Sequence, residues 1–325
     1  MSSTVAHVPE NFSSFIEALG DLPDPRDPRG KRHELVFVVS AVVLAILSGR
    51  SRASSIYRFI RNRLEWLREL LGQAQAEKGS RAQLPRILEP LDWEALNRLI
   101  ERHFGVYLER TDNQEWVAID GKVLRGAKAK QALILAVTHQ SRTVLAQAPM
   151  KGRKASEIPV VRAWLEASGL ERQKVTLDAH HCNPKTTAQI HQAGGEYVIP
   201  VKQYQPTLLA YCQHLAASAS VRARHHEHSQ GHGRHTTRTG QGFGIHTDAL
   251  DQRWSDSGVK TLVVVQRQTF TRARTQTSSE TAYYISNRAL GKTPKVHLNE
   301  LTGAIRQHWH VESDNWIRDV TFNED

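Results

Sequence analysis

The chain has 325 residues, which is enough for one large domain or two to three smaller ones. Its longest apolar run covers only residues 35–47 and is shorter than the roughly 20 residues that cross a bilayer, so the sequence argues against an integral membrane protein. Lysine and arginine outnumber aspartate and glutamate by 43 to 33, and the net charge of +10 favours a protein with a polyanionic partner over a merely basic one.

The first 110 residues are expected to be helical. A segment with three prolines, residues 21–33, interrupts them because proline is excluded from a helix interior. The long apolar run predicts a buried helix that ends at Gly49, and Asp92 is the expected N-cap of the last helix of this part. Residues 72–90 have the composition of a polar linker. The predicted helices cover residues 12–19, 34–48, 56–71 and 93–104.

From residue 116 the pattern changes to short aliphatic runs that alternate with helical ones. The strand candidates are 116–120, 132–139, 143–150, 174–178 and 196–202, and the helix candidates are 156–169 and 183–195. Their order, β-β-β-α-β-α-β, joins an antiparallel hairpin to βαβ units with right-handed crossovers. The sequence therefore predicts the α/β class and an RNase H-like core built on a mixed sheet.

Residues 205–280 have a different composition, rich in His, Arg, Gly, Ser and Thr, with one strong strand candidate at 261–268. We expect them to form a β-rich subdomain inserted in the core. A further strand at 283–288 precedes a helix at 300–318, for which Asn299 is the expected N-cap. The predicted domains are a helical N-terminal domain at 1–110 and an α/β domain at 111–325 that contains the insertion.

Three acidic residues are candidates for chemistry. Asp120 and Asp178 each follow an apolar strand, at the sheet edge where open α/β sheets bind ligands, although either could instead cap the following turn. Glu312 lies within an apolar face of the last predicted helix, where a carboxylate pairs, protonates or binds a metal. A salt bridge to Arg306 or Arg318 is the alternative for Glu312. The other residues of that face are Leu301, Ile305, Trp309 and Trp316.

Two strand-end aspartates and a helix glutamate are suited to hold two hard divalent ions, because Mg²⁺ prefers oxygen ligands. One ion activates a water or a 3′-hydroxyl, and the other stabilises the leaving oxygen of an in-line phosphoryl displacement. The three carboxylates together therefore predict metal-dependent phosphodiester chemistry.

Several segments carry a family resemblance, and they follow one another in the family's order. They are DPRDPRGKRHEL, WVAIDGKVLRGA, KASEIP, VTLDAHHCNPKTTAQI, YVIPVKQYQPTLL, GHGRHTTRTG, YYISNRAL and IRQHWHVESDNWIRDVTFNED. The chain resembles the DDE transposases of the ISAs group of insertion sequences, also known as H-repeat-associated proteins. The resemblance implies DNA transposition by cleavage and strand transfer, with Asp120, Asp178 and Glu312 as catalytic ligands of Mg²⁺ or Mn²⁺. It also implies two metal ions, double-stranded DNA as partner, and a homodimer assembled on that DNA.

Other residues and segments receive expected roles. Lys122, Arg125, Lys202 and Arg234 are candidates for phosphate contacts, since neutralisation of the backbone dominates affinity for DNA. Residues 1–110 are expected to be the transposase-associated, DNA-binding part. The N-terminus lacks the pattern of a signal peptide and there are only two cysteines, so we expect a bacterial cytoplasmic protein associated with the nucleoid.

The chain departs from the family pattern at three places and in its length. Gln203-Tyr204 stands where Gly-Asn is usual, His235-Thr236 replaces Ile-Glu, and Ser313 replaces the Asn after the glutamate. The chain stops at FNED, where the family continues, so it is expected to be a C-terminally truncated member. The alternative function is that of a catalytically inactive, DNA-binding transposase remnant.

Two further alternatives remain open. An RNase H-like nuclease that acts on RNA or branched DNA would carry the same carboxylates. The histidines between residues 225 and 235 are expected in a solvated, DNA-facing loop, with a structural zinc site as the less favoured interpretation because no matching cysteine or carboxylate spacing accompanies them.

Overall fold

The computed structural model describes residues 10–31, 33–77, 79–104, 115–123, 132–150, 157–231, 233–271 and 276–310. They fall into two compact units whose boundary lies near residue 110. In the described parts of both units, no helix is long and apolar enough to cross a membrane.

The first unit is helical. Its helices are α1 (Glu10–Ala18), α2 (Leu35–Leu47), α3 (Ala53–Asn62), α4 (Leu64–Leu70), α5 (Gln83–Leu88) and α6 (Trp93–Phe104). They enclose a core of their own, with the apolar α2 buried along most of its length and α1 packed on α6. Gly49 follows α2 with a positive φ of 77°, and the Asp92 side chain accepts a hydrogen bond from the backbone of Ala95 at 2.9 Å, so both predicted helix ends are confirmed.

Two predictions for this unit were wrong in detail. The basic amphipathic pattern over 56–71 is split into α3 and α4, which meet at Arg63. The predicted linker at 72–90 contains α5, whose Leu84 and Ile87 are buried in the core. Burial of these two apolar side chains stabilises a helix that the polar composition of the segment concealed.

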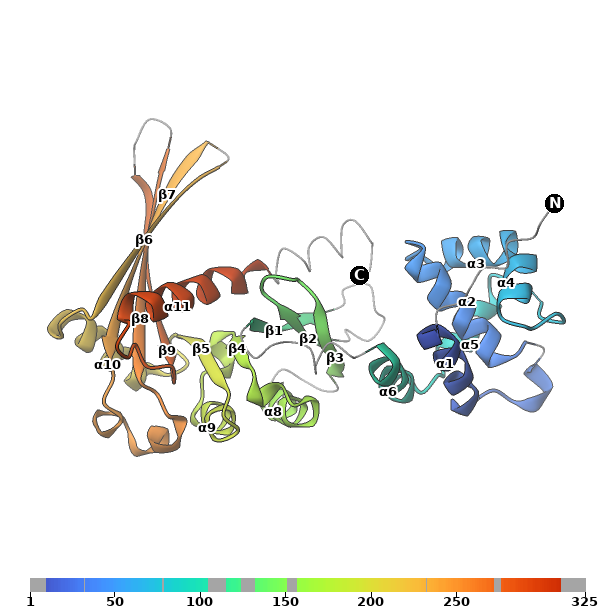
Figure 1. Ribbon diagram of the computed structural model, residues 1–325, viewed down its shortest axis with the longest axis horizontal. Coiled ribbons are helices and arrows are strands. Elements are labelled where there is room, and N and C mark those ends of the chain that lie inside the picture. Colours follow the sequence, from blue (N-terminus) through green and yellow to red (C-terminus); the bar gives the residue numbers. More distant parts are fainter. Residues whose placement is uncertain are drawn as a thin grey trace. The chain divides into compact units, whose positions relative to one another are not determined.

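The second unit is built on one mixed sheet of nine described strands (Figure 1). The strands are β1 (Trp116–Val123), β2 (Ala132–Thr138), β3 (Val144–Met150), β4 (Lys174–Leu177), β5 (Glu196–Val201), β6 (Ala223–Gly231), β7 (Arg234–Gly244), β8 (Thr261–Thr271) and β9 (Gln276–Ser286). Their order across the sheet is β3-β2-β1-β4-β5-β9-β8-β7-β6. The strands β1, β4 and β5 run parallel, and the remaining neighbours pair antiparallel.

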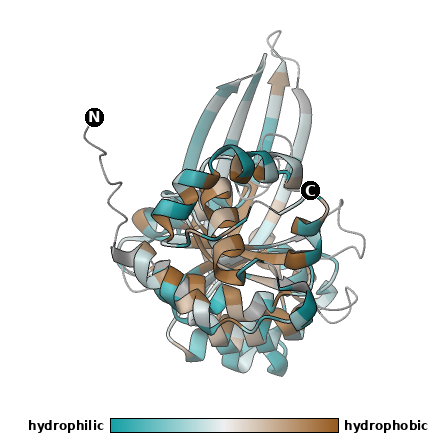
Figure 2. Cartoon of the chain, turned by 90° about the vertical axis from the view of Figure 1, so that its right-hand side faces the viewer, coloured by the Kyte–Doolittle hydropathy of each residue, from teal (hydrophilic) through white to brown (hydrophobic). Residues whose placement is uncertain are grey.

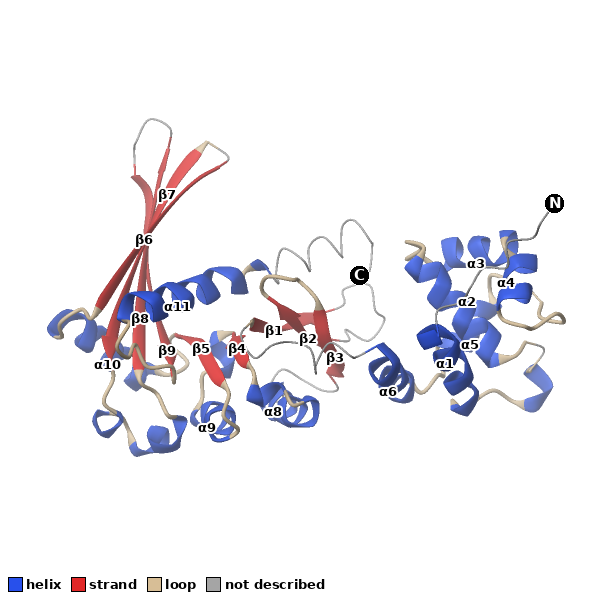
Figure 3. Cartoon of the chain, in the orientation of Figure 1, coloured by secondary structure: helices blue, strands red, loops and turns tan. Residues whose placement is uncertain are grey.

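Four α-helices in the described residues of this unit flank the sheet (Figure 3). They are α8 (Glu157–Ser168), α9 (Pro184–Gln192), α10 (Pro206–Ser218) and α11 (Pro294–His308). The helices α8 and α9 contact each other, and Figure 1 shows α11 on the opposite side of the sheet, where it contacts β1 and β4 to β8. As predicted, α8 ends before Gly169, which has a φ of 71°.

The segment predicted as an inserted β-rich subdomain extends the central sheet. It begins with α10, a helix that the sequence interpretation missed, and β6 to β9 then join the core through the pairing of β9 with β5. Exposed and less exposed residues alternate along β6, and Figure 2 shows the projecting strands largely in hydrophilic or neutral colours. The strands β6 and β7 carry few aliphatic residues, so the criterion of aliphatic runs could not find them.

The helix α11 also differs from its prediction. It begins at Pro294 after Thr293, so Asn299 lies inside the helix and is not its N-cap. Leu301 and Ile305 are buried against the sheet, as the apolar face predicted. Trp309 follows the last residue of the helix and is 54% exposed, so it does not belong to that core.

A pair of glycines provides a test of how tightly this unit is packed. Gly195 precedes β5, and an added Cβ would meet two backbone oxygens, those of Glu171 and, at 2.8 Å, Gln173. We expect Gly195→Ala to lower the free energy of unfolding by about 3 kcal/mol through this clash. Gly303, inside α11, has open space around its Cα, so Gly303→Ala is expected to raise it by roughly 0.5–1 kcal/mol. Urea denaturation followed by tryptophan fluorescence measures both, and a Gly195→Ala variant as stable as the native chain would contradict the packing.

Candidate active site

Two carboxylates lie next to each other at one edge of the parallel strands. The parallel register pairs Ile119 of β1 with Leu177 of β4, so the next residues, Asp120 and Asp178, occupy neighbouring positions. Asp178 follows the end of β4, as predicted. Asp120 differs from its prediction, because β1 continues to Val123 through its pairing with β2 and only its pairing with β4 stops before Asp120.

Both aspartates make local backbone contacts. The carboxylate of Asp178 accepts a hydrogen bond from the backbone N–H of Ala179 at 2.5 Å and caps a single 3-10 turn. Asp120 accepts one from Gly121 at 2.9 Å. Turn capping, the alternative to ligand binding, therefore occurs at Asp178, but a carboxylate has further lone pairs available to a ligand.

A pocket of about 250 Å³ opens beside the two carboxylates. Strand ends form one wall, which includes the cation of Lys202 directly after β5. The helix α11 forms another wall. The residues that matter for its chemistry are Asp120, Asp178, Lys202, Tyr284, His308 and Trp309. The pocket is thus lined by two acids, one exposed lysine and the C-terminal turn of α11.

Two buried histidines, His139 and His181, and the part-buried His308 surround this edge of the sheet. Burial is the main cause that lowers the pKa of His139 to about 3, with the charges of two other histidines adding to it. Burial likewise lowers the pKa of His181 and of His308 to about 4, and in both cases the nearby Asp178 opposes the shift. All three rings are therefore neutral at physiological pH, and they add no positive charge beside the aspartates.

A buried hydroxyl lies between two of these histidines. Thr176, two residues before Asp178 on β4, contacts His139 Nε2 at 3.0 Å and His308 Nδ1 at 2.8 Å through its Oγ1. His139 follows β2, and His308 is the last residue of α11. The hydroxyl therefore links the last turn of α11 to the centre of the sheet.

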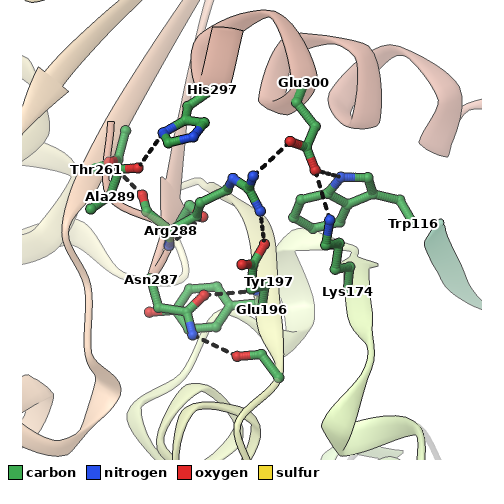
Figure 4. A network of polar contacts seen from close by, with 12 residues as sticks. Trp116, Lys174, Glu196, Tyr197, Thr261, Asn287, Arg288, Ala289, His297 and Glu300 are labelled. Carbon is green, nitrogen blue, oxygen red and sulfur yellow. Dashed lines mark hydrogen bonds and ion pairs between the residues drawn. The ribbon is translucent and has the colours of Figure 1, made fainter. Parts of the chain in front are cut away.

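At the opposite end of the parallel strands a charged network fixes α11 to the sheet (Figure 4). Glu300 of α11 accepts hydrogen bonds at one oxygen from Trp116 Nε1 at 3.1 Å and Lys174 Nζ at 3.0 Å. Its other oxygen forms an ion pair with Arg288 at 2.8 Å, and Arg288 also pairs with Glu196 at 2.6 Å. The helix is therefore attached at two points that lie two turns apart, at Glu300 and at His308.

A second pocket, of about 470 Å³, adjoins the first and shares three lining residues with it, Tyr284, Ile305 and Trp309. Its floor is the face of β6 to β9, and three arginines line it. Arg267 pairs with Glu280 at 2.8 Å and Arg306 pairs with Glu227. Burial, together with the charge of Arg267, lowers the pKa of the third arginine, Arg238. A groove lined by three arginines, two of them paired with glutamates, thus adjoins the pocket of the two aspartates.

The remaining predicted site residues are not all brought together. Arg234 is exposed at the far end of β7, beside the turn to β6, and does not line the pocket. The backbone of Lys122 continues β1, but Arg125 and Glu312 lie outside the residues that the structure describes. Within the described ranges no three metal-binding side chains form a cluster, the histidines of β6 and β7 included.

Comparison with known proteins follows the same division of the chain. Residues 16–104 match the family model described as DDE_Tnp_1-associated, and residues 113–315 match the model described as Transposase DDE domain. The chain belongs to the DDE transposase family. The match extends over both units, so the helical part and the α/β part occur together in this family.

Relatives of this DDE transposase family member match it over most of their own length. "Putative transposase YncI" of Escherichia coli O157:H7 is 26% identical, over 97% of this chain and 82% of that protein. "H repeat-associated putative transposase YhhI" of Escherichia coli strain K12 is 24% identical, over 97% of this chain and 84% of that protein. "Uncharacterized protein in dhlA 3'region" of Xanthobacter autotrophicus is 28% identical, over 78% of this chain and 92% of that protein.

Sequence reasoning missed several residues of this transposase site. Side chains alternate between the two faces of a strand, which places Thr176 on the same face as Asp178, so Thr176 could have been predicted from the sequence. His308 and Glu300 share a face of α11 because they lie two turns apart. His139 gave no signal of its own, since only the three-dimensional pairing of β2 beside β1 brings it to Thr176.

Proposed function

We propose that the chain is a metal-dependent transposase that cleaves the DNA ends of an insertion sequence and transfers the strands, with Asp120, Asp178 and Glu312 as its catalytic carboxylates. The observation that carries this proposal is the adjacent placement of Asp120 and Asp178 at the edge of β1 and β4, in a chain of the DDE transposase family. Glu312 lies outside the described residues, and the match to the transposase DDE domain over residues 113–315 includes it, which supports its assignment to the same site.

The order of the first five strands supports an RNase H-like core. A hairpin meander, β3-β2-β1, continues through the parallel neighbours β4 and β5, and the chain passes through the elements in the order β-β-β-α-β-α-β. In such a sheet the carboxyl ends of the parallel strands share one edge, where ligands bind. This geometry accounts for the meeting of two acids that are 58 residues apart in the chain.

The donor set at this edge fits a hard divalent ion. Asp120 and Asp178 offer carboxylate oxygens, which are the ligands that Mg²⁺ and Mn²⁺ prefer. Bound between these carboxylates, two such ions would supply Lewis acidity to the attacking oxygen and to the leaving oxygen. The protein itself contributes the charge of the acids, the neutral histidines that leave this charge intact, and the walls of the pocket.

The DNA partner is supported by the cations next to the acids. Lys202 lines the acid pocket, and three arginines line the adjoining groove, whose floor is formed by β6 to β9. Phosphate neutralisation by such side chains holds DNA without reading its sequence. Residues 1–110 are proposed as a further DNA-binding part, and a homodimer on DNA is proposed because both ends of an element must be processed together.

Cleavage of DNA by the purified chain tests this function. The substrate is a duplex that contains the DNA flanking the coding region on each side, incubated with Mg²⁺, with Mn²⁺ or with a chelator. We expect nicks at defined positions with either ion and none with the chelator. Salt-sensitive binding without cleavage under every condition would instead identify an inactive DNA-binding protein, and preferred cleavage of RNA would identify a different nuclease.

A further inference from the structure

We propose that Thr176 is a positioning residue that holds His308 in one tautomer, with the ring proton on Nε2, so that this N–H serves as a hydrogen-bond donor in the acid pocket. The donor would take an anionic oxygen, of the class that a DNA phosphate presents. The tautomer follows from the geometry of the sheet and α11, whereas the role of the His308 donor in cleavage rests on the proposed function.

The geometry places one hydroxyl among three candidate partners. Thr176 Oγ1 lies 2.8 Å from His308 Nδ1, 3.0 Å from His139 Nε2 and 3.5 Å from the carbonyl oxygen of Val117. Thr176 is 2% exposed and His139 is 5% exposed. The two ring contacts have ordinary hydrogen-bond lengths, whereas the carbonyl contact is at the long limit, so the hydroxyl serves the two histidines.

The number of available protons selects one arrangement of the hydrogen bonds among His139, Thr176 and His308. Each neutral imidazole carries one N–H and one acceptor nitrogen, and the threonine hydroxyl has one hydrogen to donate. His139 Nδ1 is buried and has no hydrogen-bond partner among the residues that the structure describes. An orphaned buried N–H is rarer than an orphaned acceptor, so the proton of His139 belongs on Nε2 and is donated to Thr176. Thr176 then donates its own hydrogen to Nδ1 of His308, which leaves the His308 proton on Nε2.

Burial supports the neutral state of both rings that this chain of hydrogen bonds requires. It is the largest cause that lowers the pKa of His139 to about 3 and that of His308 to about 4. A protonated His308 would carry N–H groups on both nitrogens, and Thr176 would then have to accept from two donors at once. The arrangement His139 to Thr176 to His308 is thus the one in which every donor of the chain has an acceptor.

The consequence of this arrangement appears in the acid pocket. His308 lines the pocket together with Asp120 and Asp178, and its Nδ1 is occupied by Thr176. The protonated Nε2 is the remaining polar atom of the ring, and it adds a neutral donor to a pocket that carries two acids and Lys202. A donor there holds an anionic oxygen without competing with the carboxylates for cations. Thr176 acts through His308, so it is a positioning residue rather than a catalytic one.

The decisive test reads the tautomer directly. We expect the nitrogen NMR spectrum of the full chain, labelled with ¹⁵N-histidine, to show His308 with an unprotonated Nδ1 and a protonated Nε2; the signals are assigned by their loss in His308→Asn. Thr176→Val keeps the volume of the side chain but removes the hydroxyl, and it should yield a mixture of tautomers. Thr176→Ser keeps the hydroxyl and should retain the native spectrum. A protonated Nδ1 in the native chain, or an unchanged spectrum in Thr176→Val, would overturn the proposal.

Cleavage of the flanking duplex provides the second readout. In Thr176→Val the His308 donor is displaced by a fraction of an ångström, and we expect cleavage to slow on the order of tenfold. The affinity for DNA should not change. Thr176→Ser should restore the cleavage rate. Equal losses in both variants would assign the effect to packing and reject the positioning role. If the native chain cleaves no DNA, the proposed function fails, but the NMR measurement still decides the tautomer.

Discussion

Replacing Asp178 by asparagine is expected to slow metal-dependent cleavage of the flanking duplex on the order of 1000-fold or more while DNA binding persists. The amide keeps the size of the side chain, and its oxygen can still accept the hydrogen bond from Ala179. The variant loses the negative charge through which, in the proposed function, a divalent ion would be held between Asp178 and Asp120. Single-turnover cleavage measures the rate constant, and fluorescence anisotropy of labelled duplex measures the affinity.

The control for this prediction is a matched change elsewhere on the same unit. Asp248 is exposed on a 3-10 turn and lies apart from the residues that line the acid pocket, so Asp248→Asn should cleave at the native rate. Asp120→Asn should reproduce the loss seen for Asp178→Asn. Native-like cleavage by Asp178→Asn, or an equal loss in Asp248→Asn, would exclude the carboxylate pair as the metal site.

The sequence predicted the core around these two acids better than the elements attached to it. Aliphatic runs identified β1 to β5 and two of the flanking helices because a strand that is buried on both faces consists almost entirely of such residues. The same criterion missed β6 and β7, since Thr, Gly, His and Arg form strands there through the ladder pairing of β6 with β7 and of β7 with β8 rather than through burial on both faces. A subdomain was therefore predicted where the sheet simply continues.

Local sequence signals likewise explain which residues of the candidate site could be predicted and which could not. The strand period and the strand ends pointed to Asp120 and Asp178, because both signals are local in sequence. The Thr176 bridge depends on side chains from β2, β4 and α11, which come together only through the topology of the sheet. Glu300 was not singled out because an acidic residue within a helix usually faces solvent, and the cations that surround it lie more than ten residues away.

Replacing Glu300 by glutamine is expected to lower the free energy of unfolding by roughly 2 kcal/mol at neutral pH, below the 3–5 kcal/mol typical of fully buried pairs. The side chains of Glu300, Lys174 and Arg288 are only 28%, 17% and 18% exposed, so loss of the carboxylate charge leaves two cations near a neutral amide in a poorly solvated site. Arg288 keeps its pair with Glu196, which limits the loss.

The matched control is Glu280→Gln, which removes the carboxylate of a surface pair. Glu280 and Arg267 are 61% and 49% exposed, and such pairs contribute about 0–1 kcal/mol. Urea denaturation of the two variants beside the native chain separates the cases. Equal losses for Glu280→Gln and Glu300→Gln would show that the Glu300 network does not fix α11 to the sheet.

The difference in unfolding free energy between the native chain and Glu300→Gln should depend on pH if its origin is electrostatic. Burial alone would raise the pKa of Glu300, but the hydrogen bond from Lys174 and the charges of Arg288 and Lys174 outweigh it, and the pKa is lowered from its ordinary value of 4.5. A carboxyl whose pKa is lowered by folding stabilises the folded state above the unfolded pKa, and this stabilisation is lost as the pH falls through the folded pKa. The native chain should therefore lose its advantage over Glu300→Gln as the pH drops below 4.5. A difference that stays constant from neutral to acid pH would mean that Glu300 contributes by packing, and α11 would then depend on the Thr176 bridge and its apolar contacts for its position on the sheet.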